Sequence, residues 1–299
     1  MAPLSTSLAL AVAGAAGVIL AGPAAGVAAP DRIVGGVTTY AVKQGDTLRI
    51  IGARYGTDPQ TLVADNALPP SAILRVGQRL TIDNRHIVPG GVSPGAIVVN
   101  VPQRMLYYGV ETDDVRGMPV AAGQRGWPTP IGEFTVVTKK TDPSWEVPAS
   151  ILEEARQRGR PLPAIVPPGP ANPLGKFWLG LSVGHLGIHG TNAPSSVYGT
   201  VTHGCIRLGP DDIAWLYAQV TVGTPGRFVY EPVLVTADGS EVFLEVHADV
   251  YQRTASASQL ARDLASAEGV MDRVDWVLAD AIIAARHGIA RRVTVDITR

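Results

Sequence analysis

Residues 185–208 read HLGIHGTNAPSSVYGTVTHGCIRL, and they contain three of the six histidines and the only cysteine of the chain. Glycines recur through this stretch, and its apolar residues are too scattered to form one face of a helix. The pattern predicts a strand, a loop, and then a tight turn at His203-Gly204-Cys205. Short strands separated by turns are typical of a sandwich or barrel, so we expect a mainly β domain around this stretch.

Short apolar runs on both sides of the stretch extend the β pattern. The predicted strands span residues 97–101, 104–108, 134–138, 177–183 and 186–189. A turn is expected at 129–132, and the Pro-rich insertion 139–176 carries one short helix, 149–158, with Ser150 as its candidate N-cap. Long insertions in compact domains are lids, binding loops or disordered segments, and we favour a lid beside the active site.

Helical patterns appear after the stretch. A helix is predicted at 213–220, with Asp211 or Asp212 as its N-cap. Beyond it, residues 231–299 predict a small α/β extension with two helices, whose role no motif indicates. Its expected elements are a strand at 241–246, a helix marked by Leu260 and Leu264, a helix at 270–285, and a last strand marked by Val293, Val295 and Ile297.

The first 29 residues differ from the rest because they contain no charged side chain. Their apolar run, residues 8–20, is shorter than the ~20 residues that a membrane span needs. Val27-Ala28-Ala29 is typical of a cleavage site, so residues 1–29 predict a secretory signal peptide. We therefore expect a protein of the periplasm or cell envelope with no stable transmembrane span after signal removal; an uncleaved anchor is the alternative.

Residues 38–83 form a compact unit with the order strand, helix, helix, strand. They closely resemble a LysM domain, through Tyr40-x-Val42, Gly45-Asp46-Thr47-Leu48, Ile51, Tyr55-Gly56, Leu62, Asn66 and Gly77-Gln78-x-Leu80. The resemblance implies binding of N-acetylglucosamine-containing glycans in a groove near Asp46, Thr47, Leu48 and the loop after Asn66. A small αβ unit without glycan affinity is the alternative.

Composition sets broad limits on function. The chain has 299 residues, enough for two domains, and 46% of them are hydrophobic, so a proper core can form. Its net charge of −1 gives no sign of the strongly basic face that nucleic-acid binding needs, so we expect no nucleic-acid partner.

The lone cysteine is either inert or chemically active, because it has no partner for an internal disulfide. Its position after His203-Gly204 in a polar, glycine-rich turn favours activity. A cysteine nucleophile attacks as the thiolate and needs a neighbouring base, for which His189 and His203 are candidates. Gly204 lets the backbone turn so that amides near Cys205 can point at a developing oxyanion.

A metal site is the competing interpretation of these side chains. His185, His189, His203 and Cys205 are all types that bind zinc. Their spacing matches neither a zinc finger nor the HExxH motif. We therefore predict no metal and no cofactor.

The segments around His189 and Cys205 resemble the signature of a known enzyme family. His189-Gly190-Thr191-Asn192 and Thr202-His203-Gly204-Cys205-Ile206-Arg207-Leu208 resemble the active-site signature of L,D-transpeptidase catalytic domains of the YkuD type. The turn sequence Thr129-Pro130-Ile131-Gly132-Glu133-Phe134 matches the family's Thr-Pro-x-Gly-x-Phe stretch. Residues 172–175 and 244–247 resemble the ErfK/YbiS-like branch. Thr202 stands where serine is commoner. We expect the catalytic domain to span residues 96–230.

The resemblance implies a role for each residue of the signature. Cys205 attacks, and His189 acts as general acid and base. His203 and Gly204, with the Cys205 amide, shape the oxyanion site. Arg207 binds a substrate carboxylate or braces the loop, and Thr202 supports the site by hydrogen bonding. Two further residues, Gly190 and Thr191, are expected near the substrate.

The implied reaction is acyl transfer on peptidoglycan. The donor is a tetrapeptide stem with a diamino acid in third place and D-alanine at its end. The acceptor is another stem, which gives a 3→3 cross-link, or the lysine of an outer-membrane lipoprotein, and carbapenems are expected to acylate Cys205. Three alternatives stay open: an L,D-carboxypeptidase, another cysteine amidase with the same dyad, and a non-catalytic LysM protein that binds the envelope.

Overall fold

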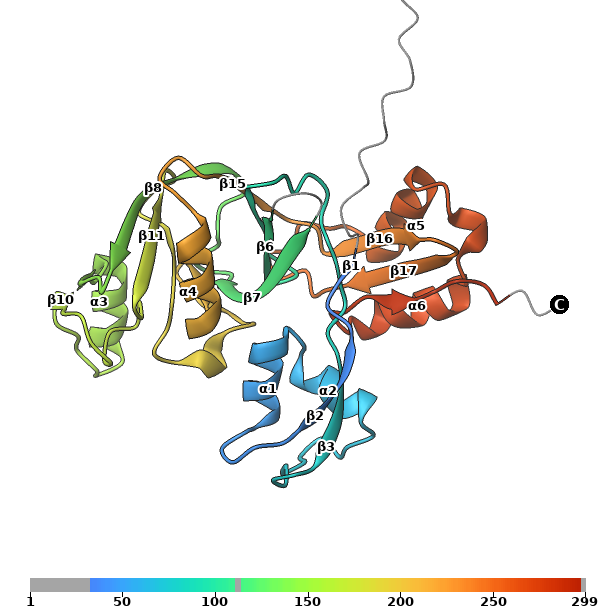
Figure 1. Cartoon of the computed structure of the whole chain (residues 1–299), viewed down its shortest axis with the longest axis horizontal. Helices are drawn as coiled ribbons and strands as arrows, with labels where there is room; N and C mark the ends of the chain where they lie inside the picture. Colours follow the sequence, from blue (N-terminus) through green and yellow to red (C-terminus); the bar gives the residue numbers. More distant parts are fainter. Residues whose placement is uncertain (1–32, 111–113, 297–299) are drawn as a thin grey trace, which may run out of the picture.

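The computed structural model describes residues 33–110 and 114–296, so the predicted signal peptide at 1–29 lies outside the described residues. Three lobes follow one another along the chain, at residues 37–83, 97–229 and 233–292 (Figure 1). Each lobe has its own apolar core. Within the described ranges, no helix is long and apolar enough to cross a membrane.

The N-terminal lobe has the predicted order of elements. It consists of β2 (Val37–Ala41), α1 (Leu48–Tyr55), α2 (Pro59–Asp65) and β3 (Arg79–Asp83), with β2 antiparallel to β3. Thr47 caps α1, because its Oγ1 accepts a hydrogen bond from the Ile50 amide at 3.2 Å. Gly56 ends the helix in the left-handed region, with φ of 72°. The core of this lobe is formed by Tyr40, Val42, Ile51, Leu62, Leu80 and Ile82.

The central lobe is a mixed sheet that closes on itself. Its strands are β5 (Ile97–Asn100), β6 (Met105–Gly109), β7 (Val115–Gly123), β8 (Gly132–Thr141), β11 (Phe177–Leu181), β12 (Gly187–His189), β13 (Thr200–Thr202), β14 (Ile206–Leu208) and β15 (Pro225–Val229). Their order is β13-β7-β14-β12-β11-β8-β15-β5-β6, and β7 also pairs with β6. The predicted mainly β class is confirmed.

Two long strands join the two halves of this closed sheet. The first part of β7 pairs with β6, and its end pairs with β14 and β13. In the same way β8 pairs with β15 and then with β11. Strand β7 was not among the predicted strands, because Gly117 and Pro119 interrupt its apolar pattern. Pro119 lies opposite Met105, just before β7 passes from one half of the sheet to the other.

Two predicted helix caps are wrong. The insertion forms β9 (Trp145–Glu146), α3 (Ala149–Gln157) and β10 (Ile165–Val166), and the cap position of α3 is Pro148 rather than Ser150. The helix α4 (Pro210–Gln219) begins at its proline, with Gly209 as the cap residue. Pro210 takes the first helical position because its missing N–H is not needed there. Asp211 and Asp212 therefore lie in the first turn, where a carboxylate favours the positive end of the helix.

The C-terminal lobe packs two helices against a small sheet. Its elements are β16 (Val233–Asp238), β17 (Glu241–Val246), α5 (Ala257–Ala267), α6 (Trp276–Ala285) and β18 (Arg291–Arg292). The second helix starts later than predicted, because the Asp275 carboxylate accepts hydrogen bonds from the amides of Val277 and Leu278. The last strand is β18 rather than residues 293–297, and position 297 lies outside the described residues.

Candidate active site

The parallel pairing of β12 with β14 brings the two central candidates together. Ile188 lies opposite Ile206, and both are fully buried in the core of the central lobe. Because successive side chains alternate across a strand, His189 and Arg207 project from the other face of this pair. Cys205 directly precedes β14, two residues before Arg207, and shares that face. A rise of about 3.3 Å per residue and a strand spacing of about 4.8 Å place the Cα atoms of Cys205 and His189 roughly 8 Å apart.

The Cys205 thiol is half-buried, and its surroundings act on its ionisation in opposite directions. Burial raises the pKa of the thiol above its usual value, and this effect prevails. A hydrogen bond from the Gly187 backbone and the positive charge of Arg207 favour the thiolate. The resting form near neutral pH is therefore the thiol, so attack requires a base that removes its proton.

The His189 ring is arranged to act as that base. Its Nδ1 lies 2.7 Å from the carbonyl oxygen of Gly190, so Nδ1 carries the proton and Nε2 carries the lone pair. Burial, followed by the charge of Arg207, lowers the pKa of His189 to about 3. The ring stacks on Trp178 of β11, with ring centres 5.9 Å apart. Between the described Cys205 and His189 there is no direct hydrogen bond; in free enzymes such contacts often tighten only when substrate is bound.

The turn that carries Cys205 is held by two threonine hydroxyls. Thr202 Oγ1 donates to the Cys205 carbonyl at 2.6 Å and accepts from the Gly204 amide at 3.2 Å. Thr129 Oγ1 donates to the Gly204 carbonyl at 2.9 Å. Gly204 has φ of 101°, a conformation that side chains rarely adopt. Since the Gly204 amide already bonds Thr202, the Cys205 amide is the better candidate oxyanion donor.

His203 contacts the Pro-rich insertion. Its Nε2 lies 2.9 Å from a carboxylate oxygen of Glu154 on α3, and its ring stacks on Trp127 with centres 4.9 Å apart. The left-handed Gly204 breaks the extended geometry that would have aimed His203 and Cys205 at the same side. His203 thus links the catalytic turn to the insertion through Glu154. Of the two candidate bases, His189 is the better one.

Arg207, Gly190 and Thr191 complete the predicted set. One Arg207 nitrogen, Nη1, donates to Ser196 Oγ at 2.9 Å, whereas its buried Nε has no hydrogen-bond partner among the described residues. Gly190 is buried where an added Cβ would lie 3.1 Å from Ile213. Thr191 Oγ1 accepts from the Ala193 amide at 2.9 Å. Among the predicted site residues that the structure describes, Arg207 Nε and His203 Nδ1 are thus the buried side-chain atoms without a hydrogen-bond partner.

A hollow of about 530 Å³ lies beside Thr191, next to this end of β12. Charged and amide side chains line it, together with backbone of the insertion's end. These side chains are Asp142, Asn172, Lys176 and Asn192.

The predicted LysM residues lie at the start of α1 and the end of α2. Asp46 accepts from the Tyr40 hydroxyl at 2.5 Å and from the Lys43 amide at 2.9 Å. Asn66 bonds the backbone of Leu62 and Thr81 through both ends of its amide. Thr47 caps the helix, and Leu48 packs on the lobe's core. The polar atoms of these side chains are thus engaged within the lobe, while Ile73 in the loop after Asn66 is 90% exposed.

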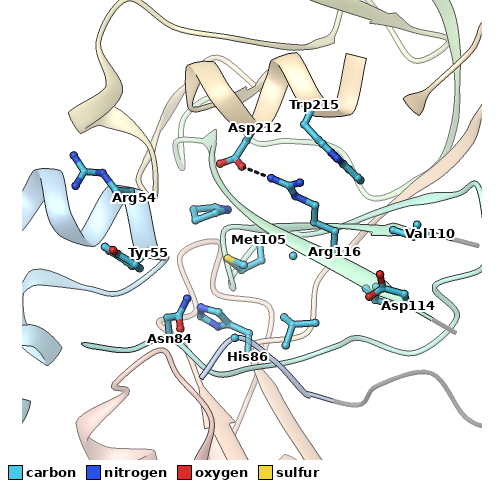
Figure 2. Close-up of a pocket in the computed structure, with 15 residues that line it drawn as sticks. Arg54, Tyr55, Asn84, His86, Met105, Val110, Asp114, Arg116, Asp212 and Trp215 are labelled. Atoms are coloured by element: carbon cyan, nitrogen blue, oxygen red, sulfur yellow. Dashed lines mark hydrogen bonds and ion pairs between the residues drawn. The ribbon is translucent and has the colours of Figure 1, made fainter. Parts of the chain in front are cut away.

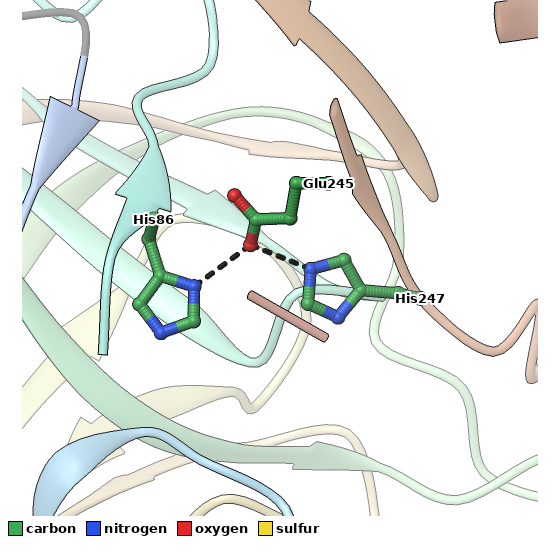
Figure 3. Close-up of side chains that lie close together, drawn as sticks. All are labelled: His86, Glu245 and His247. Carbon is green, nitrogen blue, oxygen red and sulfur yellow. Dashed lines mark hydrogen bonds and ion pairs between the residues drawn. The ribbon is translucent and has the colours of Figure 1, made fainter. Parts of the chain in front are cut away.

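A second titratable cluster lies where the three lobes meet (Figure 3). His86 Nδ1 and His247 Nε2 lie 2.7 and 2.8 Å from the same Glu245 oxygen, and all three side chains are buried. Three such ligand types can hold a metal ion. The shared oxygen lies at hydrogen-bond distance from each nitrogen, so hydrogen bonding accounts for this arrangement. His86 Nε2 also faces the Gly56 carbonyl at 2.9 Å. Each nitrogen of the His86 ring therefore faces an acceptor oxygen.

A cleft of about 540 Å³ separates the N-terminal lobe from the central lobe. Figure 2 shows Arg54 and Tyr55 of α1 on one side, and Asp212 and Trp215 of α4 on another. Arg116 lies over the Trp215 ring, 4.2 Å from its centre. None of residues 185–208 lines this cleft, so it is separate from the catalytic turn.

Two residues that support the site, Trp178 and Glu154, were not predicted. The Trp178 ring stacks on His189, and a Cβ at Gly187 would lie only 2.3 Å from that ring. Its pairing opposite His189 depends on strand register, which no local motif reveals. Glu154 reaches His203 across 49 residues of chain (203 − 154), and a single sequence contains no pattern for such a contact.

Comparisons with known proteins show to which family the chain belongs. A family model described as the L,D-transpeptidase catalytic domain (YkuD) matches residues 94–235, and a LysM domain model matches residues 40–83. The chain is 34% identical over 276 residues to the "Probable L,D-transpeptidase YbiS" of Escherichia coli (strain K12), covering 88% of this chain and 89% of that protein. It is 39% identical over 224 residues to the "Probable L,D-transpeptidase ErfK/SrfK" of Salmonella typhimurium, covering 73% and 71%. A solved L,D-transpeptidase from Mycobacterium smegmatis is 27% identical, with a TM-score of 0.34 over 45% of this chain and 58% of that one.

Proposed function

This chain belongs to the L,D-transpeptidase family and is a peptidoglycan L,D-transpeptidase, and we propose that Cys205 is its nucleophile and His189 its general acid and base. The observation that carries the proposal is the parallel pairing of β12 with β14, which puts both side chains on one face. The neutral His189 ring has its lone pair on Nε2 and can accept the thiol proton.

The proposed first step forms a thioester. His189 Nε2 takes the proton from Cys205 Sγ while the sulfur attacks the carbonyl carbon that joins the third stem residue to D-alanine. The Cys205 amide donates to the oxyanion that forms. His189 then returns the proton to the departing nitrogen, and D-alanine leaves.

In the proposed second step an amine replaces the sulfur. The acceptor nitrogen attacks the thioester carbonyl, His189 takes a proton from that nitrogen, and the proton returns to Sγ. A second stem peptide gives a 3→3 cross-link, and a lipoprotein lysine gives an anchored lipoprotein. Water in place of the amine gives a shortened tripeptide stem.

Arg207 is proposed to bind a carboxylate of the stem. Its Nε is buried and has no hydrogen-bond partner among the described residues, while Nη1 is held by Ser196. A guanidinium that is fixed at one end and has an unpaired N–H at the other is suited to a planar carboxylate.

The chain is proposed to work in the cell envelope. The LysM lobe is proposed to hold glycan strands, which raises the local concentration of stems at Cys205. Residues 1–29 are proposed to direct export to the periplasm.

One experiment tests the catalytic assignment. The purified protein is incubated with a tetrapeptide muropeptide, with and without an acceptor amine, and the products are weighed by mass spectrometry. We expect D-alanine release and a cross-linked product, both abolished in Cys205→Ala, and a carbapenem adduct on Cys205. Unchanged D-alanine release by Cys205→Ala contradicts the assignment, and a tripeptide product alone indicates an L,D-carboxypeptidase. Cleavage of another amide bond indicates a different cysteine amidase.

A further inference from the structure

We propose that Tyr251, in the segment that follows the catalytic domain, is a positioning residue for the catalytic turn. This inference rests on the proposed role of Cys205. Tyr251 is separated from Cys205 by 46 positions (251 − 205), and no motif of the active-site signature includes it. Its hydroxyl nevertheless belongs to a chain of hydrogen bonds that ends at the residue next to the nucleophile.

The first link joins Tyr251 to the loop that follows β7. The Tyr251 hydroxyl donates to the Gly123 carbonyl at 2.7 Å and accepts from the Thr129 amide at 3.0 Å. One hydroxyl therefore closes the two ends of the loop 123–129 against each other. Gly123 allows this closure, since a Cβ there would lie 2.3 Å from the Trp127 carbonyl oxygen.

The second link joins this loop to the catalytic turn. Thr129 is fully buried, and its Oγ1 accepts from the Gly123 amide at 3.0 Å and donates to the Gly204 carbonyl at 2.9 Å. The Gly204 carbonyl belongs to the same peptide group as the Cys205 amide. Thr129 therefore sets the orientation of the candidate oxyanion donor, and Tyr251 holds Thr129.

The segment around Tyr251 is itself rigidly held. Asp249 accepts from the amides of Arg253 and Thr254 and from the Tyr230 hydroxyl. Tyr230 also accepts from the Tyr251 amide at 2.8 Å, and the two rings stack with centres 5.3 Å apart. A hydroxyl on such an anchored ring can fix the loop, whereas a mobile one could not.

Removal of the Tyr251 hydroxyl tests the inference in the full chain. Tyr251→Phe keeps the ring stack and is expected to lower kcat for D-alanine release by about 10- to 100-fold, since small misplacement of reacting groups is costly. KM for the muropeptide is expected to stay within about 2-fold, because Tyr251 does not touch the carboxylate-binding Arg207. Acylation of Cys205 by a carbapenem should slow by the same factor as kcat. Alkylation by iodoacetamide should keep its rate, because that reaction needs the thiolate but no oxyanion donor.

Two controls separate positioning from general support. Tyr198→Phe removes another tyrosine hydroxyl between the central and C-terminal lobes, which donates to the Gly288 carbonyl at 3.1 Å, and should leave kcat unchanged. Thr129→Val should reproduce the loss seen in Tyr251→Phe, and Thr129→Ser should restore the rate. The double variant Tyr251→Phe/Thr129→Val should lose little more than either single variant.

The results that overturn the inference are distinct from those that overturn the catalytic assignment. The inference is wrong if Tyr251→Phe keeps the wild-type kcat, if alkylation slows as much as acylation, or if Tyr198→Phe loses as much activity. These measurements on the Tyr251 and Tyr198 variants apply once Cys205→Ala has shown that D-alanine release by the wild type depends on Cys205. The catalytic assignment fails only if Cys205→Ala remains active.

Discussion

The carboxylate of Glu154 lies 2.9 Å from Nε2 of His203, and this contact joins the Pro-rich insertion to the catalytic turn. The two side chains are 49 positions apart (203 − 154) and come from α3 and from the residue two before the nucleophile. His203 is held on its other side by the ring of Trp127. The insertion, predicted to be a lid, therefore contacts the turn through the Glu154–His203 pair, and both side chains are partly exposed.

Glu154→Gln should loosen α3 without unfolding the protein. Side-chain exposures of 17% for His203 and 28% for Glu154 make the pair a weak contributor to global stability. We expect a loss of about 1 kcal/mol or less, and faster amide exchange confined to residues 149–157. Glu153→Gln is the matched control, because Glu153 pairs with Arg156 on the same helix and not with the turn. Equal exchange in the two variants would contradict the lid contact.

The thiol of Cys205 should ionise at a higher pH than an ordinary cysteine. Burial raises its pKa, so the rate of iodoacetamide alkylation should still be climbing above the usual midpoint of about 8.5. Arg207→Gln removes a charge that favours the thiolate and should move the midpoint further up. Arg116→Gln, in the separate cleft, should not move it. A midpoint at or below the ordinary value, read from the mass of the alkylated peptide, would count against this picture.

The imidazole of His189 should stay neutral throughout the working pH range. Because burial and Arg207 lower its pKa to about 3, the profile of kcat/KM should lack an acid limb near pH 6.5 and should stay flat while the thiol of Cys205 is protonated. His189→Gln should reduce kcat by about 10²- to 10⁴-fold through loss of the base. His185→Gln changes an exposed histidine in the turn between β11 and β12 and should have no effect. An acid limb that disappears in His189→Gln would show that the ring titrates normally.

Glu245 should stabilise the junction of the three lobes above pH 4. Burial alone would raise its pKa, but the charge of His86 and hydrogen bonds from His247 and His86 lower it to about 2. An unfolded glutamate has a pKa of about 4.3, so this stabilisation is complete above that value and is lost as the pH falls towards 2. Glu245→Gln should cost about 3–5 kcal/mol at pH 7, because the groups that face the carboxylate, among them His86, His247 and the Ile87 amide, stay buried without their anionic partner.

Urea unfolding at pH 7 and pH 3 checks this prediction. The difference in stability between Glu245→Gln and the wild type should shrink at the lower pH. Glu241→Gln breaks an exposed pair with Arg292 and should cost less than about 1 kcal/mol at either pH. A difference independent of pH would mean that Glu245 acts through packing alone.

The exposed Ile73 should contribute to glycan binding by the LysM lobe. The polar side chains predicted to line the groove are hydrogen-bonded within the lobe. The exposed apolar side chain of Ile73 is therefore the candidate that packs against the face of a sugar ring. Ile73→Asp should weaken cosedimentation with peptidoglycan sacculi while turnover of a soluble muropeptide is unchanged. Val222→Asp, at a 61% exposed position of the central lobe, is the control. Equal losses for both variants would indicate a non-specific effect.

Local chemistry made part of this molecule predictable. The order of the LysM elements follows from the cap at Thr47, the stop at Gly56 and the proline that opens α2. The turn at Cys205 was predictable because Gly204 allows a conformation that other residues rarely adopt. These features depend on residues within a few positions of each other.

Features that depend on register or on distant contacts were not predictable. Strand β7 contains Gly117 and Pro119, which locally weaken a strand, and it forms because partners on both sides complete its pairing. The contacts of Trp178, Glu154 and Tyr251 with the active site join separate elements. A single sequence contains no spacing that encodes them.

Strand β7 pairs with both β13 and β14, the two strands on either side of Cys205. Any slip of β7 would therefore carry both flanks of the nucleophile in the same direction and preserve the shape of the turn. Substitutions at 120–122 should displace the sulfur relative to its base and leave its intrinsic reactivity intact. Strand β7 thus sets the position of the Cys205 sulfur relative to His189 without changing the reactivity of the thiol. Substitutions in this strand could therefore adjust turnover independently of the chemistry of the nucleophile.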